Sequence, residues 1–207
     1  MNKRIYLPII DNGMGLVRSS YTFSLLAGFS GRNIEIDRIS YPYPDGSCNM
    51  ATQNFLESGC DEMVIIDGDV VFSRHQIDLL LSHDEPLIFG VYPKKEIGLN
   101  FPCMALEGDV ENPFTKEGDV CEVARTARGF MRVHRSVFEK MMPHVEYYKD
   151  AQTGRMQYCF WKTLQGGHSE DFFFCDLWRS LGGKILVDKR CSVQHEGTAI
   201  YPIAGTY

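Results

Sequence analysis

The chain has 207 residues, of which 44% are hydrophobic and 23% charged, and its formal net charge is −6. This length suits one domain with a sizeable core, and the acidic balance argues against a broad nucleic-acid-binding surface. No segment approaches the roughly 18 apolar residues of a membrane span, and the early apolar run at residues 5–10 is too short for a secretory signal, so we expect a cytoplasmic protein.

The seven cysteines are scattered and include no C-x-x-C pair. An odd, dispersed set favours reduced thiols that pack as small apolar groups, and it makes a zinc site unexpected.

Strand-like and helix-like segments alternate along the chain, which predicts an α/β fold with a mostly parallel sheet. Apolar and alternating runs predict strands at residues 5–10, 33–39, 64–67, 86–92, 128–133 and 184–187. Helical spacing predicts helices at residues 17–27, 47–58, 136–142 and 171–181. A further helix is expected after residue 73, with Ile77, Leu80 and Leu81 on one face. Residues 41–46 are expected to form a turn-rich loop.

Two four-residue patterns have the form of a helix-initiating capping box. One is Ser73 followed by Gln76, and the other is Ser136 followed by Glu139. Residues 144–168 contain aromatics and glycines without a clear period, which favours a mobile segment that covers a substrate.

The most informative stretch is Val64–Phe72, an apolar, β-branched run interrupted by Asp67, Gly68 and Asp69. Carboxylates two residues apart on an extended segment point to the same side, and open α/β sheets bind ligands at the carboxyl ends of their strands. Two such carboxylates suit Mg²⁺ or Mn²⁺. Taken alone, the same residues also suit a polar turn that ends a strand.

Further motifs follow in order: Phe-Gly-Val-Tyr-Pro-Lys-Lys at 89–95, Arg-Gly-Phe-Met-Arg-Val at 128–133, Ser-Glu-Asp-Phe-Phe-Phe-Cys at 169–175, and a single histidine in the tail. With the acidic motif, this set resembles the GT-A fold glycosyltransferases, in particular small, single-domain, family 2-like enzymes of bacteria, phages and large viruses. The resemblance covers residues 62–197.

The resemblance implies a single GT-A domain over residues 1–207, with a Rossmann-like, mixed but mostly parallel sheet flanked by helices. Residues 1–95 would form the nucleotide-sugar-binding half, and residues 96–207 the acceptor-binding and catalytic half. It also implies a nucleotide-sugar donor, with a UDP-sugar favoured, and Mn²⁺ or Mg²⁺ as the cation.

The resemblance assigns the cation to Asp69, the ribose or the cation to Asp67, and a third ligand position to His195. Physically, a cation would neutralise the diphosphate as the glycosidic bond breaks. The alternative for His195 is a hydrogen-bonded surface histidine in the tail.

By the same resemblance, Asp171 would be the catalytic base of an inverting enzyme, and Glu170 would contact or orient the acceptor. A carboxylate at a helix N-terminus is stabilised as the anion by the helix dipole. Asp171 is therefore also a candidate for a helix cap, and both roles can hold together.

Basic residues after strand ends are candidates for pairing with the diphosphate or the acceptor, namely Lys94, Lys95 and Arg128. Asp37 or Arg38, late in the second strand, is a candidate for contacting the nucleotide base.

Asn49 falls where many relatives of this kind have an Arg-Asn pair, but Cys48 replaces the arginine, which puts one diphosphate contact in doubt. Phe160 and Trp161 could stack on a sugar or pack in the core.

The sequence thus predicts a cytoplasmic, metal-dependent glycosyltransferase, inverting in mechanism, that acts on a hydroxyl acceptor such as a glycan or a hydroxymethylated DNA base. One alternative is a sugar nucleotidyltransferase, which should have a basic, glycine-rich loop after the first strand; residues 11–15 lack the basic residue. The other is a non-catalytic nucleotide-sugar-binding module, which the two acidic motifs disfavour.

Overall fold

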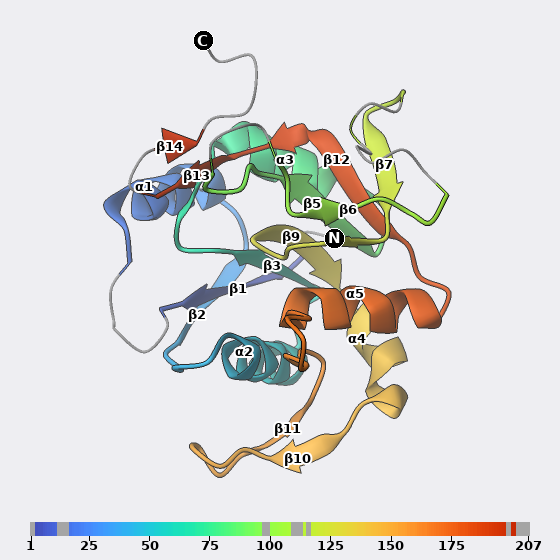
Figure 1. The fold of residues 1–207 in the computed structure, drawn as a ribbon. Helices are drawn as coiled ribbons and strands as arrows, with labels where there is room; N and C mark the ends of the chain where they lie inside the picture. Colours follow the sequence, from blue (N-terminus) through green and yellow to red (C-terminus); the bar gives the residue numbers. More distant parts are fainter. Residues whose placement is uncertain are drawn as a thin grey trace.

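The computed structural model describes residues 3–11, 17–96, 100–108, 114, 117–197 and, for the backbone, 200–201. Its centre is a seven-stranded sheet (Figure 1). In spatial order the strands are β2 (Ile34–Ile39), β1 (Ile5–Ile10), β3 (Glu62–Ile66), β9 (Phe130–His134), β5 (Leu87–Val91), β12 (Ile185–Ser192) and β7 (Val120–Val123). Only β9 and β7 run against the other five strands, so the predicted mixed, mostly parallel α/β sheet is confirmed.

Helices cover both faces of this sheet (Figure 1). One face packs against α1 (Ser19–Phe29) and α3 (Arg74–Ser82), and the other against α2 (Pro44–Ser58), α4 (Arg135–Met141) and α5 (Glu170–Ser180). Every residue of β3 and β5 is buried. Coverage on both faces explains why these strands are continuous apolar runs.

Short strands complete the fold around the main sheet. A three-stranded sheet joins β4 (Val70–Val71), β13 (Gln194–Glu196) and β14 (Ile200–Tyr201), and a two-stranded one joins β6 (Cys103–Met104) and β8 (Arg125–Thr126). After the 3₁₀ helix at Met142–His144, β10 (Tyr147–Lys149) and β11 (Met156–Tyr158) form an antiparallel hairpin. Residues 144–168, which have no clear sequence period, thus contain a regular hairpin, and their role as a mobile segment that covers a substrate stays a prediction.

Several predicted boundaries differ from those observed. Helix α2 begins at Pro44 because proline suits the first turn of a helix, so the predicted loop at 41–46 is too long. The capping box at Ser73 is confirmed, with the Ser73 N–H donating to Gln76 at 2.8 Å. The box at Ser136 is wrong, since α4 begins one residue earlier and the His134 ring accepts from the Ser136 N–H at 3.2 Å.

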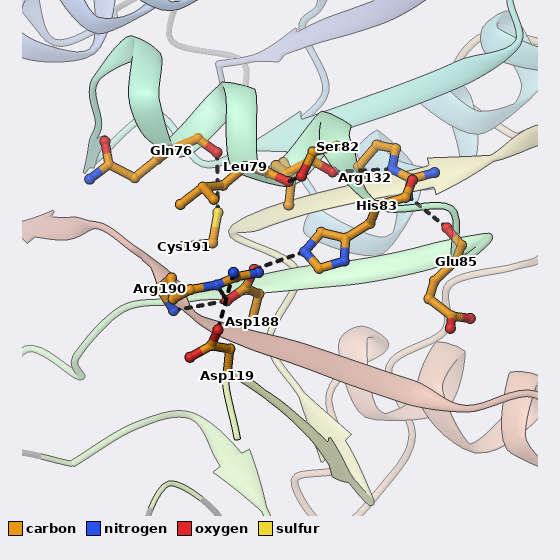
Figure 2. Close-up of polar contacts among 11 residues, drawn as sticks. Gln76, Leu79, Ser82, His83, Glu85, Asp119, Arg132, Asp188, Arg190 and Cys191 are labelled. Atoms are coloured by element: carbon orange, nitrogen blue, oxygen red, sulfur yellow. Dashed lines mark hydrogen bonds and ion pairs between the residues drawn. The ribbon is translucent and has the colours of Figure 1, made fainter. Parts of the chain in front are cut away.

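Strand β12 continues five residues beyond the predicted 187, through a polar stretch around the buried Asp188 (Figure 2). The Asp188 carboxylate binds His83 at 2.8 Å and accepts two hydrogen bonds from the Arg190 guanidinium. Arg190 also pairs with Asp119 at 3.1 Å. This network joins the C-terminal end of α3 and the residue before β7 to β12. It lies shortly before the start of β13.

All seven cysteines are free and five are buried, which confirms the expectation of reduced, packed thiols. Within the described ranges, no helix is long and apolar enough to cross a membrane.

Candidate active site

The acidic motif at 67–69 lies where β3 ends, on one wall of a cavity of about 530 Å³. Residues from both halves of the chain line the cavity, so it forms only when the whole domain folds. Its lining consists of Ile10, Asp11, Val17, Arg18, Pro44, Asp67, Gly68, Asp69, Arg128 and Glu170.

Arg128 connects the two acidic motifs. Its side chain is only 10% exposed and donates a hydrogen bond to the Asp67 carboxylate. Its Nε lies 3.4 Å from Oδ1 of Asp171, and one terminal nitrogen lies 3.9 Å from Glu170. Burial lowers the pKa of the guanidinium, but the surrounding carboxylates outweigh it and raise that pKa well above its ordinary value. Arg128 is therefore a permanent cation shared by three carboxylates.

Asp171 is almost completely enclosed, and its Oδ1 has no hydrogen-bond partner within the described residues. Burial raises the pKa of its carboxyl to about 7, against the opposing attraction of Arg128. The cap of α5 is Ser169, whose hydroxyl accepts from the Phe172 N–H at 3.4 Å. Asp171 is thus not the helix cap, and it can gain or lose a proton near neutral pH, as a general base must.

Gly129 makes the close approach of Asp67 possible. A Cβ at this position would lie 2.8 Å from Oδ2 of Asp67 and 2.5 Å from the Tyr92 hydroxyl. The Gly129 carbonyl accepts from the Asp67 N–H at 2.9 Å, and the Gly129 N–H donates to Tyr92 at 3.1 Å. Gly129 and Tyr92 therefore shape the site; both stand in the motifs quoted from the sequence, which gave neither of them a role.

His195 reaches the site through the pairing of β13 with β4, in which it lies opposite Val70. Its Nδ1 lies 2.9 Å from the Pro93 carbonyl, which can only accept, so Nδ1 carries a proton. Nε2 faces Oδ1 of Asp69 at 3.5 Å: with a proton it attracts that carboxylate, and without one it has the lone pair that a metal ligand needs. A backbone carbonyl that fixes the imidazole in this way is typical of metal-binding histidines.

Asp69 is held as an anion. Burial raises the pKa of its carboxyl, but His195 and Lys95 outweigh burial and bring that pKa well below its ordinary value. The Lys95 ammonium forms an ion pair with Oδ2. The carboxylate thus has His195 on one oxygen and Lys95 on the other.

These donors fit a divalent cation in part. A carboxylate and an imidazole lone pair that face each other suit Mn²⁺, and substrate phosphates and water commonly complete such a coordination shell. Asp67, however, is turned towards Arg128. Within the described residues, no group of three acidic, histidine or cysteine side chains is arranged to hold a metal. The fold therefore places Asp69 and His195 face to face, as two side chains of the kind that bind a divalent cation.

Other predicted site residues lie at the margin of the cavity or outside it. Arg38 donates to Asp11 at 2.8 Å, so it touches the cavity through one of its lining residues. Asp37 instead accepts from Tyr6 and, at 2.8 Å, from Asn54, which ties β2 to α2. Lys94 is exposed, and its backbone N–H donates to the Asn100 carbonyl at 2.7 Å.

Asn49 and the aromatic pair at 160–161 serve the core. The Asn49 amide donates to the Trp161 carbonyl at 2.8 Å and accepts from its N–H at 2.9 Å, so both ends of the side chain are engaged. Trp161 stacks on Phe174 at 4.2 Å, and Phe160 is completely buried. Of the two alternatives for Phe160 and Trp161, the structure shows core packing.

The structure adds residues that the sequence did not single out. Arg18 lines the cavity and pairs with Glu196 at 2.9 Å, and Ser20 also donates to Glu196. These contacts join the start of α1 to β13, next to His195. The only signal in the sequence was the position of Glu196 beside that histidine.

No family model matches the chain, and no curated protein matches it either. Among solved structures, it is similar to A197 from STIV, with a TM-score of 0.57 and 18% identity over 95% of this chain and 86% of that chain. It is also similar to GalNAc-T7, solved with UDP, GalNAc and Mn²⁺, with a TM-score of 0.52 and 10% identity. That match covers 98% of this chain but 44% of the longer protein. The chain therefore has the Rossmann-like GT-A fold.

Proposed function

We propose that the protein is a metal-dependent glycosyltransferase that moves a sugar from a nucleotide-sugar donor, with a UDP-sugar favoured, to a hydroxyl acceptor. The observation that carries this proposal is the convergence of the two acidic motifs on one cavity, joined by Arg128. The GT-A fold supports it, as does the UDP and Mn²⁺ bound in the GalNAc-T7 structure.

In this proposal Asp69 and His195 hold Mn²⁺ or Mg²⁺, which neutralises the diphosphate leaving group when bound. Asp67 and Arg128 lie beside that position. Asp67 would contact the ribose or the cation, and Arg128 would offer positive charge to the diphosphate. Asp11, which accepts a hydrogen bond from Arg38, lines the same cavity, and the nucleotide base would be placed beside this pair.

Asp171 is the proposed base, which favours an inverting course. It accepts the acceptor hydroxyl proton while that oxygen attacks the anomeric carbon from the face opposite the diphosphate. One carbon–oxygen bond forms as the bond to the diphosphate breaks, and the leaving group departs with its electron pair. Glu170, at the cavity wall, would orient the acceptor.

The donor site is assigned mainly to residues 1–95 and the acceptor site to residues 96–207 of one domain. The acceptor class that we favour is a glycan, with a hydroxymethylated DNA base as the alternative. A cytoplasmic location remains part of the proposal. The loop at residues 11–15 lacks the basic residue of a sugar nucleotidyltransferase, and its residues 12–15 lie outside the described residues.

A nucleotide panel tests the proposal. UDP, GDP, CDP and dTDP are added with and without Mn²⁺, and the melting temperature is measured, because a ligand that binds the native state raises it. One nucleotide should stabilise only with the metal, and Asp69→Asn should abolish the effect. Glu139→Gln, an exposed carboxylate on α4, is the matched control. Absence of metal-linked stabilisation by any nucleotide would overturn the proposal.

A further inference from the structure

The Lys95 ammonium occupies one side of the carboxylate that the proposed cation needs. It binds Oδ2 of Asp69, while His195 faces Oδ1 at 3.5 Å. The two side chains of the ion pair are each about one-third exposed, at 32% and 29%. The contact is therefore open enough to be exchanged for another ligand.

Lys95 and the group that orients His195 come from the same short segment after β5. The Pro93 carbonyl holds the imidazole, and Lys95 follows two residues later. The backbone hydrogen bond from the Lys94 N–H to the Asn100 carbonyl, at 2.7 Å, secures this segment between them. A cation that joined Asp69 to His195 would thus be placed beside the Lys95 ammonium.

Two positive charges at one carboxylate repel each other, and the carboxylate can neutralise only one charge. A divalent cation must therefore displace the ammonium or bind against its repulsion. A lysine side chain is long and flexible, with three N–H donors and no fixed geometry, so displacing it needs no rearrangement of the backbone.

Resting on the function proposed above, we propose that Lys95 is a built-in competitor for the metal: it neutralises Asp69 in the free protein and transfers to the donor diphosphate when the metal arrives. This exchange makes metal and donor bind together. The metal alone binds weakly because it must displace Lys95, and the diphosphate stabilises the displaced state by providing a new anionic partner for the ammonium.

The exchange has two signatures that can be measured on the full chain without catalysis. Lys95→Met should bind Mn²⁺ alone about fivefold more tightly than the wild type, the scale of a part-exposed ion pair. At saturating Mn²⁺, the same variant should bind UDP about tenfold more weakly, because a phosphate contact is lost. Mn²⁺ titration by calorimetry or electron paramagnetic resonance gives the first value, and UDP titration gives the second.

Three further variants make the result specific. Lys94→Met removes the same charge from the neighbouring, exposed position, so it should change Mn²⁺ affinity by less than about twofold. Lys95→Arg keeps the charge and should resemble the wild type. Asp69→Asn should abolish Mn²⁺ binding in both the wild-type and the Lys95→Met backgrounds.

The outcomes separate this inference from the proposed function. If Mn²⁺ and UDP bind in an Asp69-dependent way but Lys95→Met behaves like Lys94→Met, the competition is overturned and the transferase stands. Opposite changes in Mn²⁺ and UDP affinity confirm the competition. If no Asp69-dependent binding of Mn²⁺ is measured in any background, with or without UDP, both fall.

Discussion

The Nε of Arg128 and Oδ1 of Asp171 lie 3.4 Å apart, and neither atom has a hydrogen-bond partner within the described residues. The two groups attract each other by charge without a hydrogen bond to fix them. Arg128 offsets part of the cost of burying this carboxylate as an anion, and Oδ1 keeps a free lone pair. This relationship is the basis of the first three predictions.

Asp171 should control the pH dependence of catalysis. Its pKa of about 7 means that donor turnover rises as the pH increases through about 7, when the carboxyl becomes the anion that accepts a proton. Asp171→Asn should lower turnover about 10²- to 10⁴-fold and remove this step in the pH profile. A pH profile of nucleotide release measures both effects, and an unchanged step in the variant would contradict the assignment.

The raised pKa of Asp171 also predicts the direction in which stability changes with pH. The folded-state pKa of Asp171 is above its ordinary value of 3.8, so its contribution to stability is fully present below about pH 4 and is lost as the pH rises through about 7. Urea unfolding at pH 5 and pH 8 should show a smaller loss for Asp171→Asn than for the wild type. Equal losses would mean that Asp171 does not titrate in this window.

Arg128→Met should shift the rise in turnover to higher pH. Arg128 lowers the pKa of Asp171 against the effect of burial, so removing the guanidinium leaves that carboxyl harder to ionise. Loss of a buried cation shared by three carboxylates should also destabilise the fold by about 3 kcal/mol. Arg128→Lys keeps the charge and should shift the profile less. A profile that stays at the wild-type pH in Arg128→Met would exclude this electrostatic role.

Gly129→Ala should disturb the donor side of the site. The new Cβ would meet the Tyr92 hydroxyl at 2.5 Å and Asp67 at 2.8 Å, and overpacking of this kind costs about 1–3 kcal/mol. Tyr92→Phe removes the hydroxyl and should partly relieve the strain. A double-mutant cycle in urea unfolding would show this coupling, whereas additive effects would argue against the contact.

Asp188→Asn should destabilise the protein by about 2 kcal/mol at neutral pH, because the buried carboxylate that joins His83 to Arg190 is lost (Figure 2). Burial raises the pKa of Asp188, but Arg190 and His83 outweigh it and bring that pKa below its ordinary value. Its stabilisation is therefore present above about pH 4 and lost as the pH falls through the folded-state pKa. The free energy of unfolding of the wild type and of Asp188→Asn is measured at pH 7 and at pH 3. An equal difference between the two proteins at both pH values would contradict the prediction.

The sequence predicted those parts of the fold and the site that depend on local pattern. Asp67 and Asp69 follow a buried β-branched run, and the Ser73 capping box is local to one turn, so both could be recognised. The contact of His195 with Asp69 depends on the pairing of β13 with β4, about 125 residues apart in the sequence, which no local pattern specifies. Only the resemblance placed His195 in the site.

Tertiary packing determines the roles of Asn49 and Trp161. The resemblance placed Asn49 among the candidate contacts to the diphosphate, but the Trp161 backbone packs against it and takes both ends of its amide. The indole ring of Trp161 is of a kind that can stack on a sugar, but here the Phe174 ring stacks on it. Which partner fills such a position depends on the whole core, so the sequence left both alternatives open.

The most direct test of the account is nucleotide release from a panel of nucleotide-sugars, measured with and without Mn²⁺ for the wild type, Asp69→Asn and Glu139→Gln. A metal-dependent transferase should release the nucleotide from one donor class only with Mn²⁺; release should fall at least about 100-fold in Asp69→Asn and stay unchanged in Glu139→Gln. Release that is independent of Mn²⁺ and equal in Asp69→Asn, or no release from any donor, would contradict it.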